Sequence, residues 1–205
     1  MKYEWRKQEK ELYFPKTIEI KEIPEQSFLI LAGEGNPNSE LFSQQIEALY
    51  NVSYGLRMKL KKSDFVYTVY PLEGVWTTKD GSKNEHLNKE QLVYRIMIRQ
   101  PEQVTKEMVN DVITEVSKKK SNPFISQLSF EKYTDGLSIQ MIHVGSYDTE
   151  VESFRQIDAF LEQTSYEWDW VMDDYVHREI YLSDARRVVP EKRKTLLRYK
   201  LKEKK

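Results

Sequence analysis

The sequence predicts an α+β fold made of two tandem halves, each a β-hairpin, a helix and a second β-hairpin. Two observations support this prediction. Residues 67–73 align with residues 178–184, and residues 45–48 with residues 156–159, both at a separation of 111 residues (181 − 70 and 156 − 45). Apolar strands also flank one amphipathic helical stretch in the same order in each part. A repeat of sequence and element order indicates an internal duplication, which predicts pseudo-twofold symmetry.

The first half is predicted over about residues 18–100. Alternating and apolar runs predict strands over residues 18–21, 27–32, 65–70 and 92–98. Ser39 precedes a helical apolar stripe as an N-cap, and the helix is expected to run toward Lys62 with breaks near Ser53 to Gly55. Thr105 caps a connecting helix over about residues 103–120.

The second half, over about residues 125–201, repeats this order. Strands are predicted over residues 128–133, 137–144, 178–184 and 195–201, and Asp148 is the expected cap of the helix between them. An acidic, aromatic connector spans residues 166–175. The whole chain, residues 1–205, is thus one domain, with residues 1–16 as a tail packed on its body. We expect the helices on one side of the sheet and a ligand groove on the other.

Composition excludes several classes of function. The 205 residues hold 32 Lys and Arg, 33 Asp and Glu, and no cysteine, so disulfides and thiolate chemistry are absent. The balanced charge gives no reason to expect nucleic-acid binding, and no apolar run has the length of a membrane span. His86, His143 and His177 lack metal-ligand spacing, so no metal and no cofactor are expected, and His143 is interpreted as a hydrogen-bonded strand residue. A cytoplasmic location is predicted.

Glu179 is the candidate functional residue. It lies in a short apolar strand, where an ionised carboxylate is costly unless it has a partner. Alternation places His177, Glu179 and Tyr181 on one face and Arg178 and Ile180 on the other. A carboxylate among aromatic rings suits a planar aromatic or cationic small molecule. The structural alternative is a glutamate paired with a neighbouring Arg or Lys.

An ordered set of motifs resembles the GyrI-like small-molecule-binding family over roughly residues 18–201. The motifs are residues 71–76, 95–101, 140–147, 177–187 and 190–198. The resemblance implies duplicated hairpin-helix units and a groove between them with an acidic residue at its base, which falls on Glu179. The chain departs from the family pattern at Arg178 and Ala185, which flank that residue.

The same resemblance implies the function. Stand-alone members similar to this chain hydrolyse the cyclopropane ring of DNA-alkylating natural products, which predicts Glu179 as the catalytic group. The expected aromatic cage is formed by Tyr70, Trp76, Tyr147, Trp170 and Tyr181. A non-catalytic drug sensor or sequestering protein is the alternative, and a gyrase-interacting protein is a third. About 17 residues precede the first repeat, too few for a DNA-binding helix-turn-helix domain. The sequence leaves the oligomeric state open, a monomer included.

Overall fold

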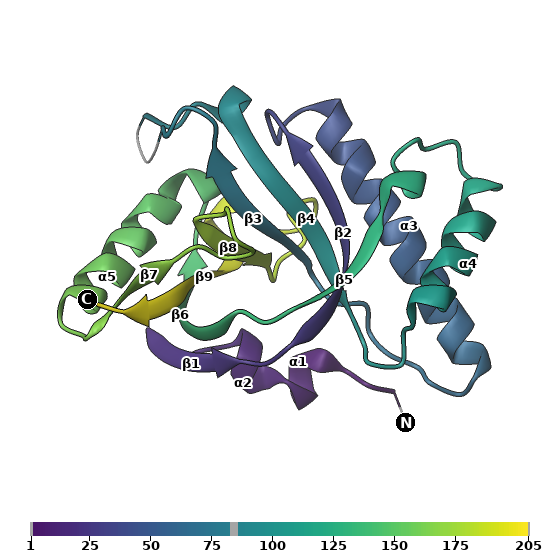
Figure 1. The fold of residues 1–205 in the computed structure, drawn as a ribbon, viewed down its shortest axis with the longest axis horizontal. Coiled ribbons are helices and arrows are strands. Elements are labelled where there is room, and N and C mark those ends of the chain that lie inside the picture. The colour runs from purple at the N-terminus through teal and green to yellow at the C-terminus, as the bar shows by residue number, and fades with distance from the viewer. Residues whose placement is uncertain (1, 83–85, 205) are drawn as a thin grey trace.

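A computed structural model describes residues 2–82 and 86–204 (Figure 1). Its helices are α1 (Trp5–Gln8), α2 (Lys10–Tyr13), α3 (Glu40–Lys62), α4 (Lys106–Ser117) and α5 (Glu150–Glu162). Short 3-10 turns are η2 (Lys89–Gln91), η3 (Ile125–Gln127), η4 (Tyr147–Thr149) and η5 (Pro190–Lys192). The strands are β1 (Glu19–Ile23), β2 (Gln26–Glu34), β3 (Leu72–Thr78), β4 (Leu92–Gln100), β5 (Ser129–Tyr133), β6 (Gly136–Val144), β7 (Tyr166–Asp169), β8 (His177–Tyr181) and β9 (Lys194–Glu203). The α+β class predicted from the sequence is confirmed.

The strands form one antiparallel sheet in the order β1-β6-β9-β8-β3-β4-β2-β5, and β7 also pairs with β9. The predicted hairpins of β1 with β2 and of β5 with β6 are not formed. β1 pairs with β6 of the other half, and β5 pairs with β2. The first strand of each half, β1 or β5, therefore pairs at the outer edge of the other half, and the two halves form one continuous sheet.

The strand order is compatible with the predicted pseudo-twofold symmetry. Exchanging β1 with β5, β2 with β6, β4 with β9 and β3 with β8 gives the same order read from the other end of the sheet. Superposition of the two halves stays a prediction. The proposed correspondence of Tyr70 with Tyr181 is not found, because residues 65–70 form no strand and β3 begins only at Leu72.

Helix α3 is continuous over Glu40–Lys62, so the break expected near Gly55 is absent. Ser39 caps it as predicted, since its side chain accepts a hydrogen bond from the Phe42 amide. Gly55 has a packing role: a Cβ atom there would lie 2.5 Å from Cγ1 of Val112 on α4. The glycine lets the two helices approach closely. At α5 the expected Asp148 cap is wrong, because the helix begins after Thr149 and Asp148 lies in η4.

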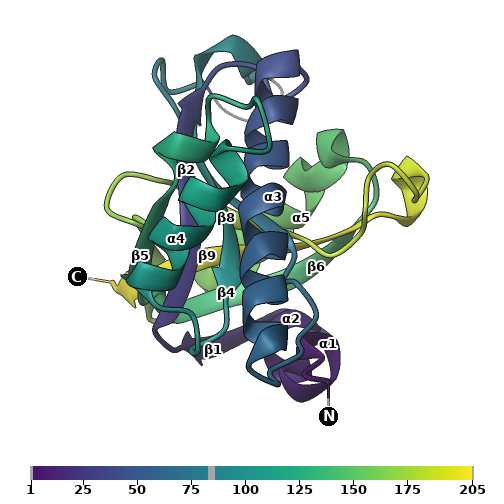
Figure 2. The same cartoon turned by 90° about the vertical axis from the view of Figure 1, so that its right-hand side faces the viewer.

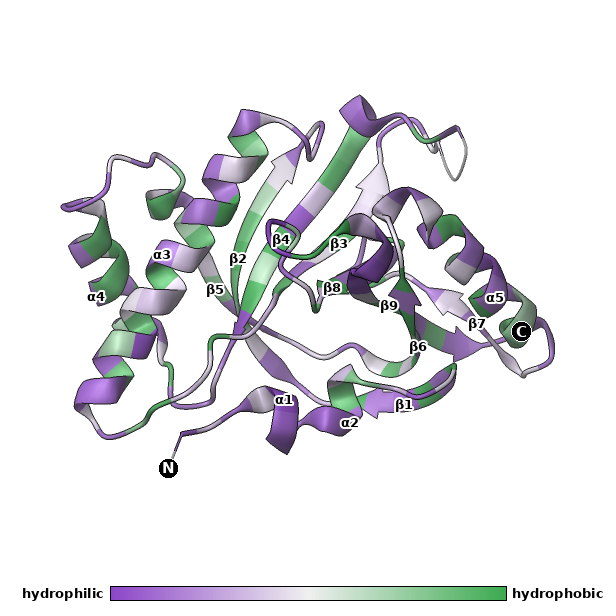
Figure 3. Cartoon of the chain, turned by 180° about the vertical axis from the view of Figure 1, so that it is seen from behind, coloured by the Kyte–Doolittle hydropathy of each residue, from purple (hydrophilic) through white to green (hydrophobic). Residues whose placement is uncertain are grey.

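The two faces of the sheet are covered differently. Helices α3 and α5 lie on the same face, one over each half, as Figures 2 and 3 show. Apolar residues of β2 and β4 pack against α3, and those of β6 and β9 pack against α5. On the opposite face Phe28, Ile30, Val75 and Met97 pack with Val171, Met172 and Tyr175, which follow β7. The opposite face is therefore filled by the chain itself rather than left open for a groove.

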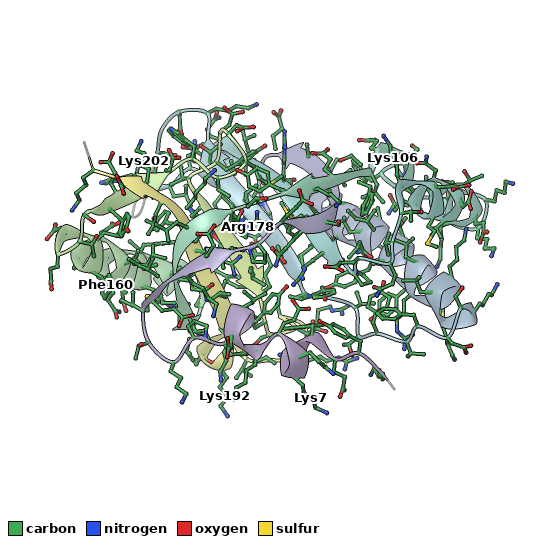
Figure 4. The ribbon with its side chains drawn as sticks, turned by 60° about the horizontal axis from the view of Figure 1, so that its bottom comes forward. Lys7, Lys106, Phe160, Arg178, Lys192 and Lys202 are labelled. Atoms are coloured by element: carbon green, nitrogen blue, oxygen red, sulfur yellow. The ribbon has the colours of Figure 1, made fainter. Side chains whose placement is uncertain are left out.

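Charged side chains are buried in the middle of that opposite face. Arg178 lies near the centre of the molecule (Figure 4) and is 1% exposed. Its guanidinium donates to Asp135 at 2.7 and 2.9 Å and to Glu73 at 3.2 Å. Burial alone would raise the pKa of Asp135, but Arg178 and Arg198 outweigh burial and lower it. Arg178 is thus paired with Asp135 and Glu73 on the face of β8 opposite the face that carries Glu179.

The N-terminal segment packs on the body, as predicted. Trp5 and Tyr13 are almost fully buried. The Trp5 indole donates to the Val69 carbonyl at 3.0 Å, and Arg6 donates to the Leu182 carbonyl at 2.7 Å. Among the described residues, none of the helices combines the length and the apolar content needed to cross a membrane.

Candidate functional site

Glu179 lies at the centre of a hydrogen-bonded chain of side chains. His177 Nε2 lies 2.8 Å from Glu179 Oε1, and the Tyr181 hydroxyl donates to Glu179 Oε2 at 2.8 Å. The Trp76 indole N–H donates to the Tyr181 hydroxyl at 3.1 Å. The Glu179 side chain is only 13% exposed, and the predicted alternation of His177, Glu179 and Tyr181 is what brings these groups together.

The register of β3 with β8 sets this geometry. Gly74 pairs with Glu179 and Trp76 with His177, so these four residues share one face at the junction of the two halves. A Cβ atom on Gly74 would lie 2.6 Å from the Trp76 Nε1 atom. The indole therefore folds over Gly74, and only a glycine leaves it room to reach Tyr181.

Both covering helices supply aromatic walls. Phe42 of α3 contacts the Trp76 ring at 6.0 Å between centroids, and Tyr94 contacts it at 5.1 Å. Phe154 of α5 lies 4.6 Å from the His177 ring. The Glu179 site is therefore on the helix side of the sheet, between α3 and α5. The sequence prediction placed the groove on the opposite side, where Arg178 and Ile180 are in fact buried.

Tyr147 and Tyr181 form the third wall. Their rings meet edge to face at 5.7 Å, and the Arg193 guanidinium lies 5.5 Å above the Tyr147 ring. Tyr147 is 37% exposed and marks the side open to solvent. Burial, then the nearby Glu179 and Glu150 charges, raise the pKa of Tyr181. Tyr181 therefore stays a neutral phenol that can donate to Glu179.

Sequence reasoning missed a second carboxyl group, Glu150. It begins α5, is 6% exposed, and its Oε1 atom has no hydrogen-bond partner among the described residues. Burial, then the charge of Glu179, raise the pKa of Glu150 well above its usual range. A signal was present, because Glu150 shares the buried stripe of α5 with Ser153 and Ile157 at helical spacing.

Two of the predicted cage residues lie in other surroundings. The Tyr70 hydroxyl donates to Glu9 at 2.5 Å, and its ring contacts Trp5, Tyr13 and the Arg99 guanidinium. Tyr70 thus anchors the N-terminal segment. Trp170 is 44% exposed and meets Trp168 edge to face at 5.3 Å. The structure brings Trp76, Tyr147 and Tyr181 to Glu179, and it shows Tyr70 and Trp170 in contact with other groups.

A small cleft lies beside α5, next to the aromatic residues that contact His177. It measures about 130 Å³ and is lined by the aromatic side chains of Phe154, Trp168 and Tyr199 together with the charged side chains of Arg155 and Asp158. The Tyr199 ring contacts both Phe154 and His177, at 5.5 and 6.0 Å. The His177 ring therefore contacts two of the side chains that line this cleft.

His143 is satisfied by its neighbours, as predicted. Its Nδ1 atom lies 2.8 Å from Ser153 Oγ, and its Nε2 atom lies 3.0 Å from the Ser146 carbonyl. Within the part of the chain that the structure describes, no three acidic or histidine side chains are grouped to hold a metal ion.

Comparisons with known proteins agree with this architecture. An uncharacterized conserved protein from Listeria innocua is 30% identical, with a TM-score of 0.90 over 98% of this chain and 100% of its own. A hydrolase from Listeria innocua is 29% identical, with a TM-score of 0.86 over the same shares. The EcmrR C-terminal domain shares the fold alone, at 11% identity and a TM-score of 0.57 over 91% of this chain and 98% of its own. No curated protein matches the chain. Residues 16–202 match the GyrI-like small molecule binding domain, and the chain is a member of that family.

Proposed function

We propose that the chain binds a planar aromatic or cationic small molecule beside Glu179 and hydrolyses cyclopropanoid DNA-alkylating toxins there. One observation carries the proposal: a carboxylate lies at the junction of the two halves, walled by Trp76, Tyr181 and His177. Aromatic faces attract flat and positively charged ligands, and a carboxylate adds charge complementarity. Membership of a small-molecule-binding family supports the binding step.

In the proposed reaction a flat ligand stacks on the aromatic walls with its strained ring toward Glu179. Glu179 accepts one proton of a water molecule while the water oxygen bonds to a cyclopropane carbon. The ring carbon–carbon bond breaks, and its electron pair moves into the conjugated system of the ligand, which then takes up the proton. Ring strain favours opening, so positioning plus general-base help of roughly 10²–10⁴-fold suffices.

Hydrogen bonds prepare Glu179 for this role. Tyr181 holds one carboxylate oxygen and His177 the other, so the side chain has a single orientation. Each carboxylate oxygen has a second lone pair, which remains for the water proton. The hydrolase from Listeria innocua, at 29% identity over nearly the whole chain, supports the catalytic part of the proposal.

A non-catalytic drug-binding or sequestering protein is the second candidate function. The same hydrogen bonds favour it, because both oxygens of Glu179 are engaged and the group is held as a fixed countercharge. A fixed countercharge stabilises a bound cation without any bond being broken. Product analysis separates the two functions.

The deciding experiment compares wild type with Glu179→Gln on one cyclopropanoid alkylator. Mass spectrometry follows the water-added, ring-opened product, and fluorescence quenching follows binding. We expect the variant to bind the alkylator nearly as well and to open it about 10²–10⁴-fold more slowly. Glu102→Gln, at an exposed turn, is the matched control and should behave as wild type.

Equal ring opening by Glu179→Gln would remove this residue from the mechanism. Binding of intact alkylator by wild type, with no product above the uncatalysed rate, would assign the chain to the non-catalytic class.

A further inference from the structure

Glu150 is an unusual residue for the first turn of a helix. A glutamate there is normally exposed and ionised, because the helix N-terminus favours negative charge. Glu150 is instead 6% exposed, and its Oε1 atom is buried without a partner among the described residues. The buried Thr195 hydroxyl lies beside Glu150 and lowers its pKa, but by less than burial and the charge of Glu179 raise it. Both side chains belong to the wall beside Tyr181, since Thr195 pairs with Tyr181 across β9 and β8.

The groups around Glu150 are acidic or neutral. The Tyr147 ring, three residues before Glu150, meets the Tyr181 ring at 5.7 Å, and Tyr181 in turn bonds Glu179 and pairs with Thr195. Glu179 of β8, Thr195 of β9 and Asp148 of η4 are accordingly the groups that act on Glu150. Two further titratable groups are near but occupied: His177 is bonded to Glu179, and His143 to Ser153. The Arg193 guanidinium is stacked on Tyr147, with its N–H groups donating to the Ala185 and Val188 carbonyls.

We propose that Glu150 and Glu179 together carry one negative charge when no ligand is bound, and that Glu150 loses its proton when a cationic ligand binds. The inference rests on the proposed function, because it assumes that the ligand sits beside Glu179. The step is balanced: the neutral Glu150 acid becomes a carboxylate, the ligand keeps its charge, and one proton passes to solvent.

Burial and repulsion between the two carboxyl groups produce this coupling. A carboxyl group that is buried among acidic and neutral groups, with no cation beside it, is favoured as the neutral acid. Two neighbouring carboxylates repel, so the proton stays while Glu179 is charged and uncompensated. A ligand cation beside Glu179 compensates that charge and attracts a second carboxylate, which lowers the pKa of Glu150. The site would thus present one negative charge to neutral ligands and up to two to cations.

Linkage gives the sign of the pH effect. Because cation binding releases a proton, affinity rises with pH through the range in which Glu150 is protonated in the empty site. The rise approaches about tenfold per pH unit when one full proton is released. A neutral planar ligand releases none, so its affinity stays flat over the same range.

The test uses N-methylacridinium, a flat permanent cation, and N-methylacridone, its flat neutral counterpart. Isothermal titration calorimetry at pH 6, in phosphate and in an amine buffer, gives the number of protons released per ligand. We expect up to one proton for the cation and none for the neutral compound. Glu150→Gln should bind the cation without proton release. Glu152→Gln, an exposed glutamate of the same helix, is the matched control and should release as many protons as wild type.

Cation binding without proton release, or with release unchanged in Glu150→Gln, would overturn the inference and leave the proposed binding site intact. Absence of binding by both probes would count against the ligand class of the proposed function instead. In that case the ¹³C carboxyl resonance of Glu150, assigned with Glu150→Gln, decides the inference in the ligand-free protein. Titration well above the usual range of glutamate supports it, and titration near pH 4–5, about the value in unstructured peptides, overturns it.

Discussion

The indole N–H of Trp76 donates to the hydroxyl of Tyr181 at 3.1 Å, across the junction of the two halves of the chain. The two residues are 105 positions apart in the sequence. This bond places one aromatic ring from each half beside Glu179, because Tyr181 in turn donates to Glu179 Oε2. The site therefore exists only when β3 and β8 are paired in their observed register.

Gly74→Ala should disorder this arrangement. The added Cβ atom would lie 2.6 Å from Trp76 Nε1 and 3.0 Å from Trp76 Cε2, so the indole has to move. We expect the Trp76–Tyr181 bond to break and ligand affinity to fall, although the strand itself accepts alanine. The indole ¹H–¹⁵N resonance of Trp76 and titration with N-methylacridinium measure the two effects. An unshifted resonance with unchanged affinity would contradict the role given to Gly74.

Trp76→Ala and Tyr181→Ala should each weaken binding of a planar ligand by about 1–3 kcal/mol, the usual loss when a stacking ring is removed. Trp170→Ala should have a smaller effect, because Trp170 contacts Trp168 and is 44% exposed. Calorimetry on the three variants with one probe makes the comparison. A larger loss of affinity for Trp170→Ala than for Trp76→Ala would indicate that the ligand stacks on Trp170 instead of Trp76.

Arg178→Met should destabilise the fold by about 3–5 kcal/mol at pH 7, because it leaves Asp135 and Glu73 buried without their main cation. In wild type the pKa of Asp135 is lowered, so its contribution is present above about pH 4 and is lost as pH falls. In the variant Arg198, 3.4 Å from Asp135, remains, but we expect burial to outweigh this one cation and raise that pKa, so that stability is lost as pH rises. Urea unfolding at pH 5 and pH 7 should show a larger deficit at pH 7. An equal deficit at both pH values would contradict this account.

Trp5→Ala should cost about 3–5 kcal/mol of unfolding free energy, as removal of a fully buried large side chain usually does. Trp5 is 2% exposed, stacks near Phe14 and Tyr70, and donates to the Val69 carbonyl. Thermal or urea unfolding measures the loss, with Trp170→Ala as the exposed tryptophan control. A loss below about 1 kcal/mol would show that the N-terminal segment packs without stabilising the domain.

The sequence by itself determined the local part of this protein. Period-two alternation placed His177, Glu179 and Tyr181 on one strand face, and helical spacing together with the Ser39 and Thr105 caps located α3 and α4. Both signals depend on backbone geometry within a few residues, so they can be read without knowing the fold. The sequence also singled out Glu179, because its carboxylate lies in a short apolar strand, where burying a charge is costly.

Only the tertiary structure decided what surrounds Glu179. The pairing of Gly74 with Glu179 selected Trp76 rather than Tyr70 as its aromatic neighbour from the first half. The packing of α5 brought Glu150 to the site, and the exchange of β1 and β5 between halves replaced the expected hairpins. These relationships join residues about 30 to 120 positions apart. They depend on which apolar surfaces pack against each other, and the local periodicity of the sequence does not predict that packing.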